Sequence, residues 1–221
     1  MKNRVIIIMF LMSVLTACEY EITDFGFEGA VSGTVKDATG TPVYADLTTN
    51  TLVVKLLGEG DKLPAEIRVN GEGKYQNLKM FPKKHKVWLE GPIVKSDTFS
   101  VDFAKDKEVV QDFTVAPLVI SKITGGSATG TTIKVDYVIT PASGITVKKM
   151  EIYCSTVPYP TTSTGSLTNI YFTSKTNLTA LSGSVTISGL AAATKYYIRI
   201  GTQGGTSAVY NFSNQITVST P

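Results

Sequence analysis

The stretch "GLAAATKYYIRI" (Gly189–Ile200) carries the clearest fold signal in this chain of 221 residues. Its second half has the period-2 alternation of a β-strand. Tyr196, Ile198 and Ile200 share one face of the expected strand, and Arg199 lies on the other. We therefore expect the tyrosine and the isoleucines to face a core and Arg199 to face solvent.

This stretch resembles the corner between the E and F strands of fibronectin type III domains. The resemblance implies that Leu190 fills the core and that Tyr196 is the corner tyrosine, whose hydroxyl bonds to nearby backbone. Further strand-like segments have the spacing of a seven-strand sandwich: "PLVISKI", "TTIKVDYVITP", "VKKMEIYCS", "GSVTISGL" and "NQITVST". We assign residues 117–221 to a fibronectin-III-like β-sandwich.

Alternation also predicts the faces of two other strands in this half. The segment "TTIKVDYVITP" has a shared apolar face made of Ile133, Val135, Tyr137 and Ile139. The segment "KKMEIYCS" places Met150, Ile152 and Cys154 on one face and Lys149, Glu151 and Tyr153 on the other. We expect Cys154 to be a small buried core residue.

A second group of short strands is expected over residues 28–116. In "GAVSGTVKDATGTPVYADL", Val31 and Val35 point one way, and the polar set Ser32, Thr34 and Lys36 points the other. Asp37, Gly40 and Pro42 supply turn chemistry before another expected strand, and "NGEG" (70–73) signals a hairpin. About seven strands in this length favour a small β-sandwich, so the whole chain is expected to be all-β.

The opening "GTVKDATGTPV" and the later stretch "GKYQNLKMFPKKHKVWLEGP" resemble carboxypeptidase-regulatory-like (prealbumin-like) domains. In those domains a glycine and then an aromatic residue commonly precede the later strand. Here Lys83 and His85 stand at those places, so the turn is expected to differ. Such domains are usually non-catalytic modules that pack against or present other domains.

The first 17 residues have the three parts of an export signal. Lys2 and Arg4 form a positive start, and the apolar run "VIIIMFLMSVL" that follows is too short to cross a bilayer as a stable helix. The next residues, "LTAC", resemble the bacterial lipobox. The resemblance implies cleavage before Cys18 and acylation of this cysteine, which would anchor the chain in a membrane. The alternative is a plain secretory leader with a chance cysteine.

Residues 18–27 read as a tether. Its acidic residues, Glu19, Glu21 and Asp24, resemble the surface-export signal of Bacteroidetes lipoproteins. The resemblance implies an outer-membrane protein that faces outward. A solvated tether in the periplasmic leaflet is the alternative.

Charge and composition argue against several functions. Lys2 and Arg4 supply two of the 21 basic residues, so 19 remain against 18 acidic ones, with no basic stripe for nucleic acid. The only histidine, His85, shares a face with Val87 and Leu89 and is expected to cap the core edge, so no multi-histidine triad or metal site is available.

No nucleophile elbow, phosphate loop or calcium loop is present in the sequence. The carboxylates of the first domain read as scattered, solubilising positions rather than a glycosidase pair: Asp97, Asp102, Glu108 and Asp112. We therefore expect neither an enzyme nor a bound cofactor or metal.

Aromatic side chains are the candidates for stacking on sugars. Trp88 lies on the face of Lys84, Lys86 and Glu90, and three tyrosines complete the set of candidates: Tyr159, Tyr171 and Tyr210. The alternative is that all four are ordinary packing aromatics. The long loop at 155–177 is the expected location of a site, because function tends to lie on loops held by a rigid scaffold.

As a whole, the chain resembles an uncharacterised family of Bacteroidetes lipoproteins with a regulatory-like and a fibronectin-III-like domain. The matching residues are Cys18, "SGTVKDATGTPV", "NGEGKYQNLKMF", "EGP" and "VAPLVISKI". Members resemble accessory lipoproteins of starch-utilisation-type glycan uptake systems. The resemblance implies a role either in carbohydrate capture or in organising the uptake complex. The partners it implies are a glycan and an outer-membrane transporter with its partner lipoprotein. The rival hypothesis is a structural surface adhesin or fimbrial-type subunit.

Overall fold

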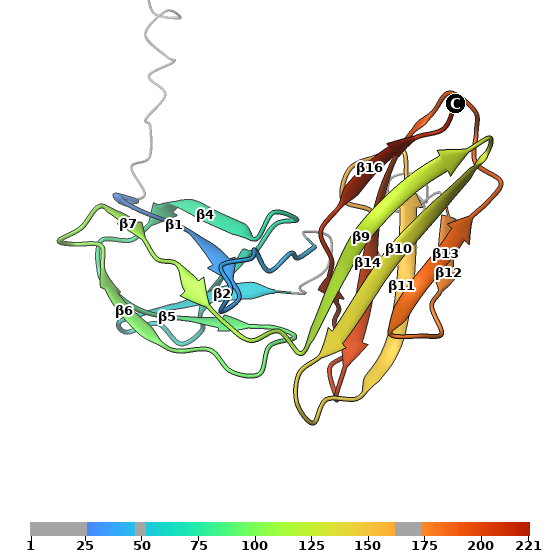
Figure 1. Cartoon of the computed structure of the whole chain (residues 1–221). Coiled ribbons are helices and arrows are strands. Elements are labelled where there is room, and N and C mark those ends of the chain that lie inside the picture. Colours follow the sequence, from blue (N-terminus) through green and yellow to red (C-terminus); the bar gives the residue numbers. More distant parts are fainter. Residues whose placement is uncertain (1–25, 47–51, 162–173) are drawn as a thin grey trace, which may run out of the picture.

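The computed structural model describes residues 26–46, 52–161 and 174–221 (Figure 1). Every regular element in these ranges is a β-strand, so the prediction of an all-β fold is confirmed. The predicted leader, the lipid-anchor cysteine Cys18 and the candidate Tyr171 lie outside the described residues.

The first half of the chain forms two facing sheets around one core. One sheet has the order β4-β1-β7, with β8 also pairing with β1, and the other has the order β3-β2-β5-β6. The strands are β1 (Gly29–Lys36), β2 (Val53–Gly58), β3 (Ala65–Arg68), β4 (Lys74–Met80), β5 (Lys84–Glu90), β6 (Phe99–Asp102), β7 (Glu108–Val110) and β8 (Phe113–Thr114). His85 is buried and packs edge-on against Phe103, in agreement with its predicted place at the core edge.

Strand β1 is the central strand of its sheet. It pairs antiparallel with β4 and parallel with β7 and β8. Val31 and Val35 are fully buried, and Ser32, Thr34 and Lys36 lie on the opposite face, as the alternation predicted. The outer face of this sheet therefore has only small or flexible polar side chains along its middle strand.

The turn at Asn70–Lys74 forms, but it does not join paired strands. The Asn70 side-chain oxygen accepts hydrogen bonds from the amides of Glu72 and Lys74, each at 2.9 Å, and Gly73 has a φ of 77°. Strand β3 then pairs with β2, whereas β4 pairs with β1 in the other sheet. The prediction of a simple hairpin was wrong, because the turn carries the chain from one sheet to the other.

The strand expected after the "DATGTP" turn does not form as a regular strand. Asp37 closes this turn by accepting the amides of Thr39 and Thr41 at 2.8 and 3.0 Å. Between residue 42 and residue 46, where this described range ends, only isolated bridges occur, and one of them joins Tyr44 to Phe212 in the second half of the chain.

The second half also forms two sheets. Their orders are β13-β10-β9 and β12-β11-β14-β15, with β16 also pairing with β14. The strands are β9 (Val119–Thr129), β10 (Thr132–Pro141), β11 (Val147–Ser155), β12 (Ser174–Asn177), β13 (Ser182–Ile187), β14 (Lys195–Gly204), β15 (Asn211–Phe212) and β16 (Ile216–Ser219). Cys154 is buried between them, as predicted, and burial raises the pKa of its thiol to about 12.

The predicted corner is present at the start of β14. Leu190 is buried in the core, and the Tyr196 hydroxyl accepts a hydrogen bond from the Ala191 amide at 2.9 Å. Ile198 and Ile200 are fully buried on the same face. These contacts confirm the fold that the opening stretch predicted.

The opposite face of this sheet does not follow the prediction. Arg199 is only 1% exposed, although alternation placed it in solvent, and Glu151 and Tyr153 are buried as well. Tyr44 of the first half packs over Tyr153, Tyr210 and Phe212, so this face has a small core of its own. The alternation is correct, but a neighbouring segment covers the face that it assigns to solvent.

The two sandwiches also meet at the connection between them (Figure 1). Ile93 and Pro117 form an isolated bridge, and the Asn211 side chain donates to the Pro92 carbonyl oxygen at 2.9 Å. Hydrogen bonds, and not only the linking chain, therefore join the two halves.

Candidate functional site

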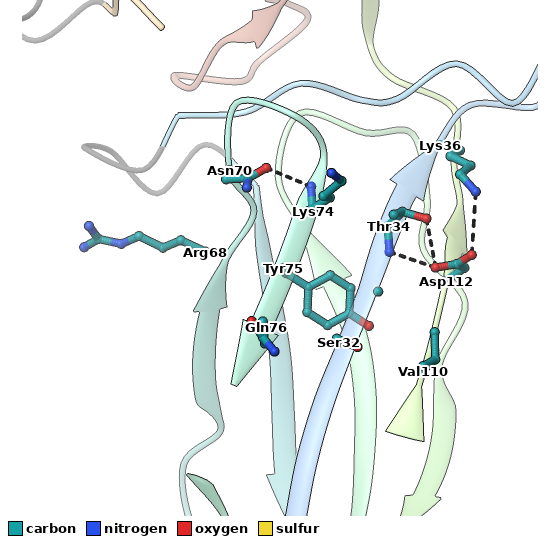
Figure 2. Close-up of a pocket in the computed structure, with 11 residues that line it drawn as sticks. Ser32, Thr34, Lys36, Arg68, Asn70, Lys74, Tyr75, Gln76, Val110 and Asp112 are labelled. Carbon is teal, nitrogen blue, oxygen red and sulfur yellow. Dashed lines mark hydrogen bonds and ion pairs between the residues drawn. The ribbon is translucent and has the colours of Figure 1, made fainter. Parts of the chain in front are cut away.

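A hollow lies on the outer face of the β4-β1-β7 sheet (Figure 2). It is an open groove of about 700 Å³. Its lining residues are Ser32, Gly33, Thr34, Lys36, Arg68, Asn70, Lys74, Tyr75, Gln76, Val110 and Asp112. We call this feature the β1 groove.

The floor of the β1 groove is built from small residues on the central strand. Ser32 is in register with Gln76 on β4 and with Val110 on β7, so longer side chains flank a short one. Gly33 is required where β1 passes closest to the backbone of Gln111, because a Cβ on residue 33 would lie 2.0 Å from the Gln111 carbonyl oxygen. The groove thus follows from strand order and side-chain size.

One wall of the groove carries a fixed carboxylate. The Thr34 amide and hydroxyl both donate to Asp112 Oδ1 at 2.8 Å, and the Lys36 ammonium lies 3.7 Å from Oδ2. The hydrogen bond from the Thr34 amide holds the pKa of Asp112 below its usual range, against partial burial, and Lys36 adds to the effect. Asp112 is therefore ionised at neutral pH, and it lies outward, as the sequence predicts, but Thr34 fixes its position.

Beneath the floor, Tyr75 supports the groove without contributing a free polar group. Its side chain is buried, and its hydroxyl donates to the Gln111 carbonyl oxygen. Burial raises the pKa of Tyr75, so the hydroxyl stays neutral and keeps this hydrogen bond.

The Asn70–Lys74 turn closes one end of the groove. Lys74 Nζ lies 2.9 Å from Glu72 Oε2, so the lysine is paired within the turn. Figure 2 shows Arg68 directed away from the other side chains that line the groove.

Two polar side chains in the middle of the groove remain without an internal partner. Among the described residues, the Ser32 hydroxyl and the Gln76 amide make no hydrogen bond. They lie side by side in the β1–β4 register, and the next outward register pair, Thr34 and Lys74, places Asp112 and Lys74 further along the same groove. The groove therefore offers a hydroxyl, an amide, a cation and a carboxylate to a bound molecule.

The chemistry of this set suits binding. It contains no nucleophile with an adjacent base and no pair of facing carboxylates. In the part of the chain that the structure describes, no group of three or more His, Cys, Asp or Glu side chains could hold a metal ion.

The aromatic candidates from the sequence lie elsewhere. Trp88 is half-buried on the outer face of the other sheet, where its indole donates to Glu90 at 2.8 Å. Tyr210 is buried, and its hydroxyl donates to Glu151 at 2.9 Å. Tyr159 is 38% exposed and touches the end of the groove through Glu72. None of the three lines the β1 groove, and sugar stacking by these residues stays a prediction.

A second hollow of about 600 Å³ lies where the two sandwiches meet. Its lining is more apolar: Asp37, Ala38, Thr39, Lys95, Asp97, Thr114, Val115, Ala116, Pro117, Ile120, Thr140, Pro141 and Ala142. The Asp37 carboxylate is already bonded within its own turn, and Lys95 and Asp97 are the other charged residues of this lining.

The sequence predicts the outward residues that form the floor of the groove, but it does not predict the residues that form its walls. The outward set Ser32, Thr34 and Lys36 was visible in the alternation of β1. Gln76 and Asp112 come from segments 44 and 78 residues away from Ser32 and Thr34, and no local signal joins them.

Comparison with known proteins shows which solved structures share this fold. Neither a protein-family model nor a curated protein sequence matches this chain. Solved structures do match. A DUF3823 family protein from Bacteroides ovatus aligns with a TM-score of 0.67 at 17% identity, over 88% of this chain and 100% of that one.

Two further structures are similar. A DUF3823 family protein from Parabacteroides merdae has a TM-score of 0.67 at 16% identity, over 86% of this chain and 98% of its own. A Bacteroides uniformis protein named "putative carbohydrate binding protein" has a TM-score of 0.65 at 18% identity, over 88% of this chain and 100% of its own. At these identities the likeness establishes the shared two-sandwich fold.

Within residues 26–46, 52–161 and 174–221, no helix has the length and apolar character needed to cross a membrane.

Proposed function

We propose that this chain is a non-enzymatic glycan-binding protein and that the β1 groove is its binding site. The observation that carries the proposal is the pair of unpartnered side chains, Ser32 and Gln76, in one groove with the charged side chains of Asp112 and Lys74, which lie beside the next outward residue Thr34. The name of the similar Bacteroides uniformis protein supports the same ligand class.

The groove meets the physical needs of glycan recognition. Sugar hydroxyls both donate and accept hydrogen bonds, and the groove presents hydrogen-bond donors as well as acceptors. Asp112 is held by two hydrogen bonds from Thr34, so little freedom is lost when it accepts a bond from a ligand. Ser32, Thr34 and Gln76 lie on paired strands, which hold side chains more accurately than loops do.

Titration calorimetry of the full chain against a panel of soluble polysaccharides tests the proposal. For a polysaccharide that binds, the double variant Ser32→Ala/Gln76→Ala should weaken affinity at least tenfold, which corresponds to about 1.4 kcal/mol. The matched control is Thr186→Ala, which removes an exposed hydroxyl on β13. Binding by no polysaccharide, or equal affinity of the double variant and the parent, would overturn the proposal.

We also propose that the chain is an outer-membrane lipoprotein, anchored through acyl chains on Cys18, and an accessory component of a polysaccharide uptake system. The leader and the "LTAC" sequence support the anchor. Metabolic labelling with palmitate should mark the parent and not a Cys18→Ala variant, and labelling of both would contradict this anchor. Co-purification with an outer-membrane transporter and its partner lipoprotein tests the assembly.

The fimbrial alternative would need an open sheet edge for a donor strand, and one edge of the second domain is already occupied. The amides of Val119 and Ile123 on β9 donate to the side chains of Asn211 and Asn214 at 3.0 and 2.9 Å. These side chains cover a strand edge that would otherwise pair with another chain. Filament formation by the purified protein would favour the alternative.

A further inference from the structure

We propose that Tyr159 is a positioning residue through which the second domain fixes the Asn70–Lys74 turn at the end of the β1 groove. The significance of this for ligand binding rests on the function proposed above. The mechanical role itself does not, and it is argued from the contacts of Tyr159 alone.

On the first-domain side, Tyr159 holds the turn at two points. Its hydroxyl donates to Glu72 Oε1 at 2.9 Å, and the other oxygen of that carboxylate binds Lys74 Nζ at 2.9 Å. One carboxylate therefore links the tyrosine to a cation of the groove. The ring also covers Gly71, since a Cβ on this glycine would lie 2.3 Å from Tyr159 Cδ1.

On the second-domain side, the backbone around Tyr159 is held just as firmly. The Tyr159 amide donates to the Gln215 side-chain oxygen, and the next carbonyl, that of Pro160, accepts a bond from Arg199 Nε at 2.5 Å. Arg199 is buried, with its guanidinium 3.8 Å from the centre of the Phe212 ring. The tyrosine thus projects from a fixed base.

The backbone of Tyr159 itself indicates that its position is imposed by its surroundings. Its φ is +57°, in the left-handed region, which costs a residue with a side chain about 1 kcal/mol. Such conformations persist where surrounding contacts over-determine them, and they cluster at functional sites. Here the determining contacts are those to Gln215, Glu72 and Gly71.

The turn does not need Tyr159 in order to fold. The Asn70 side chain already binds the amides of Glu72 and Lys74 within the turn. The pairing of Lys74 with Thr34 already places the base of the turn, so Tyr159 acts on its outer part: it holds Gly71 and the Glu72 carboxylate, and through that carboxylate the Lys74 ammonium. Its hydrogen bond also contributes, after that of Lys74, to lowering the pKa of Glu72.

The test is nuclear magnetic resonance of the full chain, with amide order parameters for residues 71–74 and a titration of the Glu72 carboxyl group. In the Tyr159→Ala variant these order parameters should fall from the rigid range near 0.85 toward 0.6. In Tyr159→Phe, which keeps the ring, mobility should change less while the pKa of Glu72 rises. Gly71→Ala keeps Tyr159 in the sequence but should also mobilise the turn, because the new methyl group displaces the tyrosine ring.

The matched control is Tyr137→Phe, which removes a hydroxyl that donates to the Ala180 carbonyl oxygen at 3.2 Å in the same domain. It should leave the turn and the pKa of Glu72 unchanged. Order parameters of the turn that stay at parent values in both Tyr159→Ala and Gly71→Ala would overturn the inference.

A ligand measurement separates this inference from the proposed function. If a polysaccharide from the panel binds, Tyr159→Phe should weaken it several-fold while Tyr137→Phe does not. Equal affinity of Tyr159→Phe and the parent would limit the role to the turn itself and remove the link to binding. If no polysaccharide binds, the proposed function fails, and the order parameters still decide the positioning role.

Discussion

Strands β1 and β14 have the same alternating pattern, yet the outer face of β1 is open and that of β14 is buried. On β1 the outward residues Ser32 and Thr34 line an open groove. On β14 the outward residue Arg199 is almost fully buried, because Pro160 and the first domain's Ala45 lie over it and accept its hydrogen bonds. Alternation separates the two faces of a strand, but a partner from elsewhere in the chain decides whether the second face meets water.

The largest expected effect comes from removing the buried cation. Arg199→Ala should lower the free energy of unfolding by about 3 kcal/mol, since it leaves a cavity and two buried carbonyl oxygens without their donor. Urea unfolding followed by circular dichroism measures the effect. The control is Lys195→Ala, an exposed basic residue on the same strand. An Arg199→Ala variant as stable as this control would mean that the face is not covered in solution.

A second test addresses the buried carboxylate on the neighbouring strand β11. Burial opposes ionisation of Glu151, but hydrogen bonds from Tyr153, Lys149 and Tyr210 outweigh it and lower its pKa. A lowered pKa in the folded state stabilises the fold above the unfolded pKa of about 4.3, and this contribution is lost as the pH falls through the folded pKa.

Glu151→Gln should therefore cost about 2 kcal/mol at pH 7, because it removes charge-assisted hydrogen bonds. The difference from the parent should shrink as the pH falls below about 4. Unfolding curves of both proteins across this pH range measure it. A difference that does not change with pH would contradict the assigned charge.

A smaller effect is expected at the corner on the core side of β14. Tyr196→Phe removes the acceptor of the Ala191 amide and should cost about 1 kcal/mol. Thermal unfolding measures this loss of stability. The control is Tyr197→Phe, which changes a neighbouring tyrosine on the other face of β14. No loss of stability would mean that the corner hydrogen bond is replaced by water.

The smallest effect on stability is expected on the open face. Ser32→Ala/Gln76→Ala should change the free energy of unfolding by no more than about 0.5 kcal/mol, since neither side chain has an internal hydrogen bond. The same urea experiment measures it. A loss as large as that of Arg199→Ala would show that β1 and β14 do not differ in the way described.

Most of the fold was predictable from short-range pattern. Leu190, Tyr196 and Ile198 lie where the opening stretch placed them, and Cys154 and His85 are buried as expected. These residues obey the period of a strand and the chemistry of one corner, and both act over a few residues.

The site was less predictable, because its parts come from distant segments. Asp112 is an outward carboxylate, as the sequence predicts, but the hydrogen bonds from Thr34 that fix it come from 78 residues away. Sugar stacking by Tyr159 stays a prediction, whereas the hydrogen bond from its hydroxyl to Glu72 across the domain junction is seen only in the structure. Neither contact leaves a signal in the local sequence.

The sequence by itself determined that the chain is all-β, which residues share a face on each strand, and that one corner belongs to a fibronectin-III-like sandwich. These properties follow from backbone geometry and from the separation of apolar and polar side chains along a strand. Only the tertiary structure decided which polar faces stay open. Strand order brought Gln76 and Asp112 to the two sides of β1, and domain packing buried Arg199 beneath the first domain. Whether one face of a strand is buried depends on the segment that packs against it, and the tertiary fold determines which segment that is.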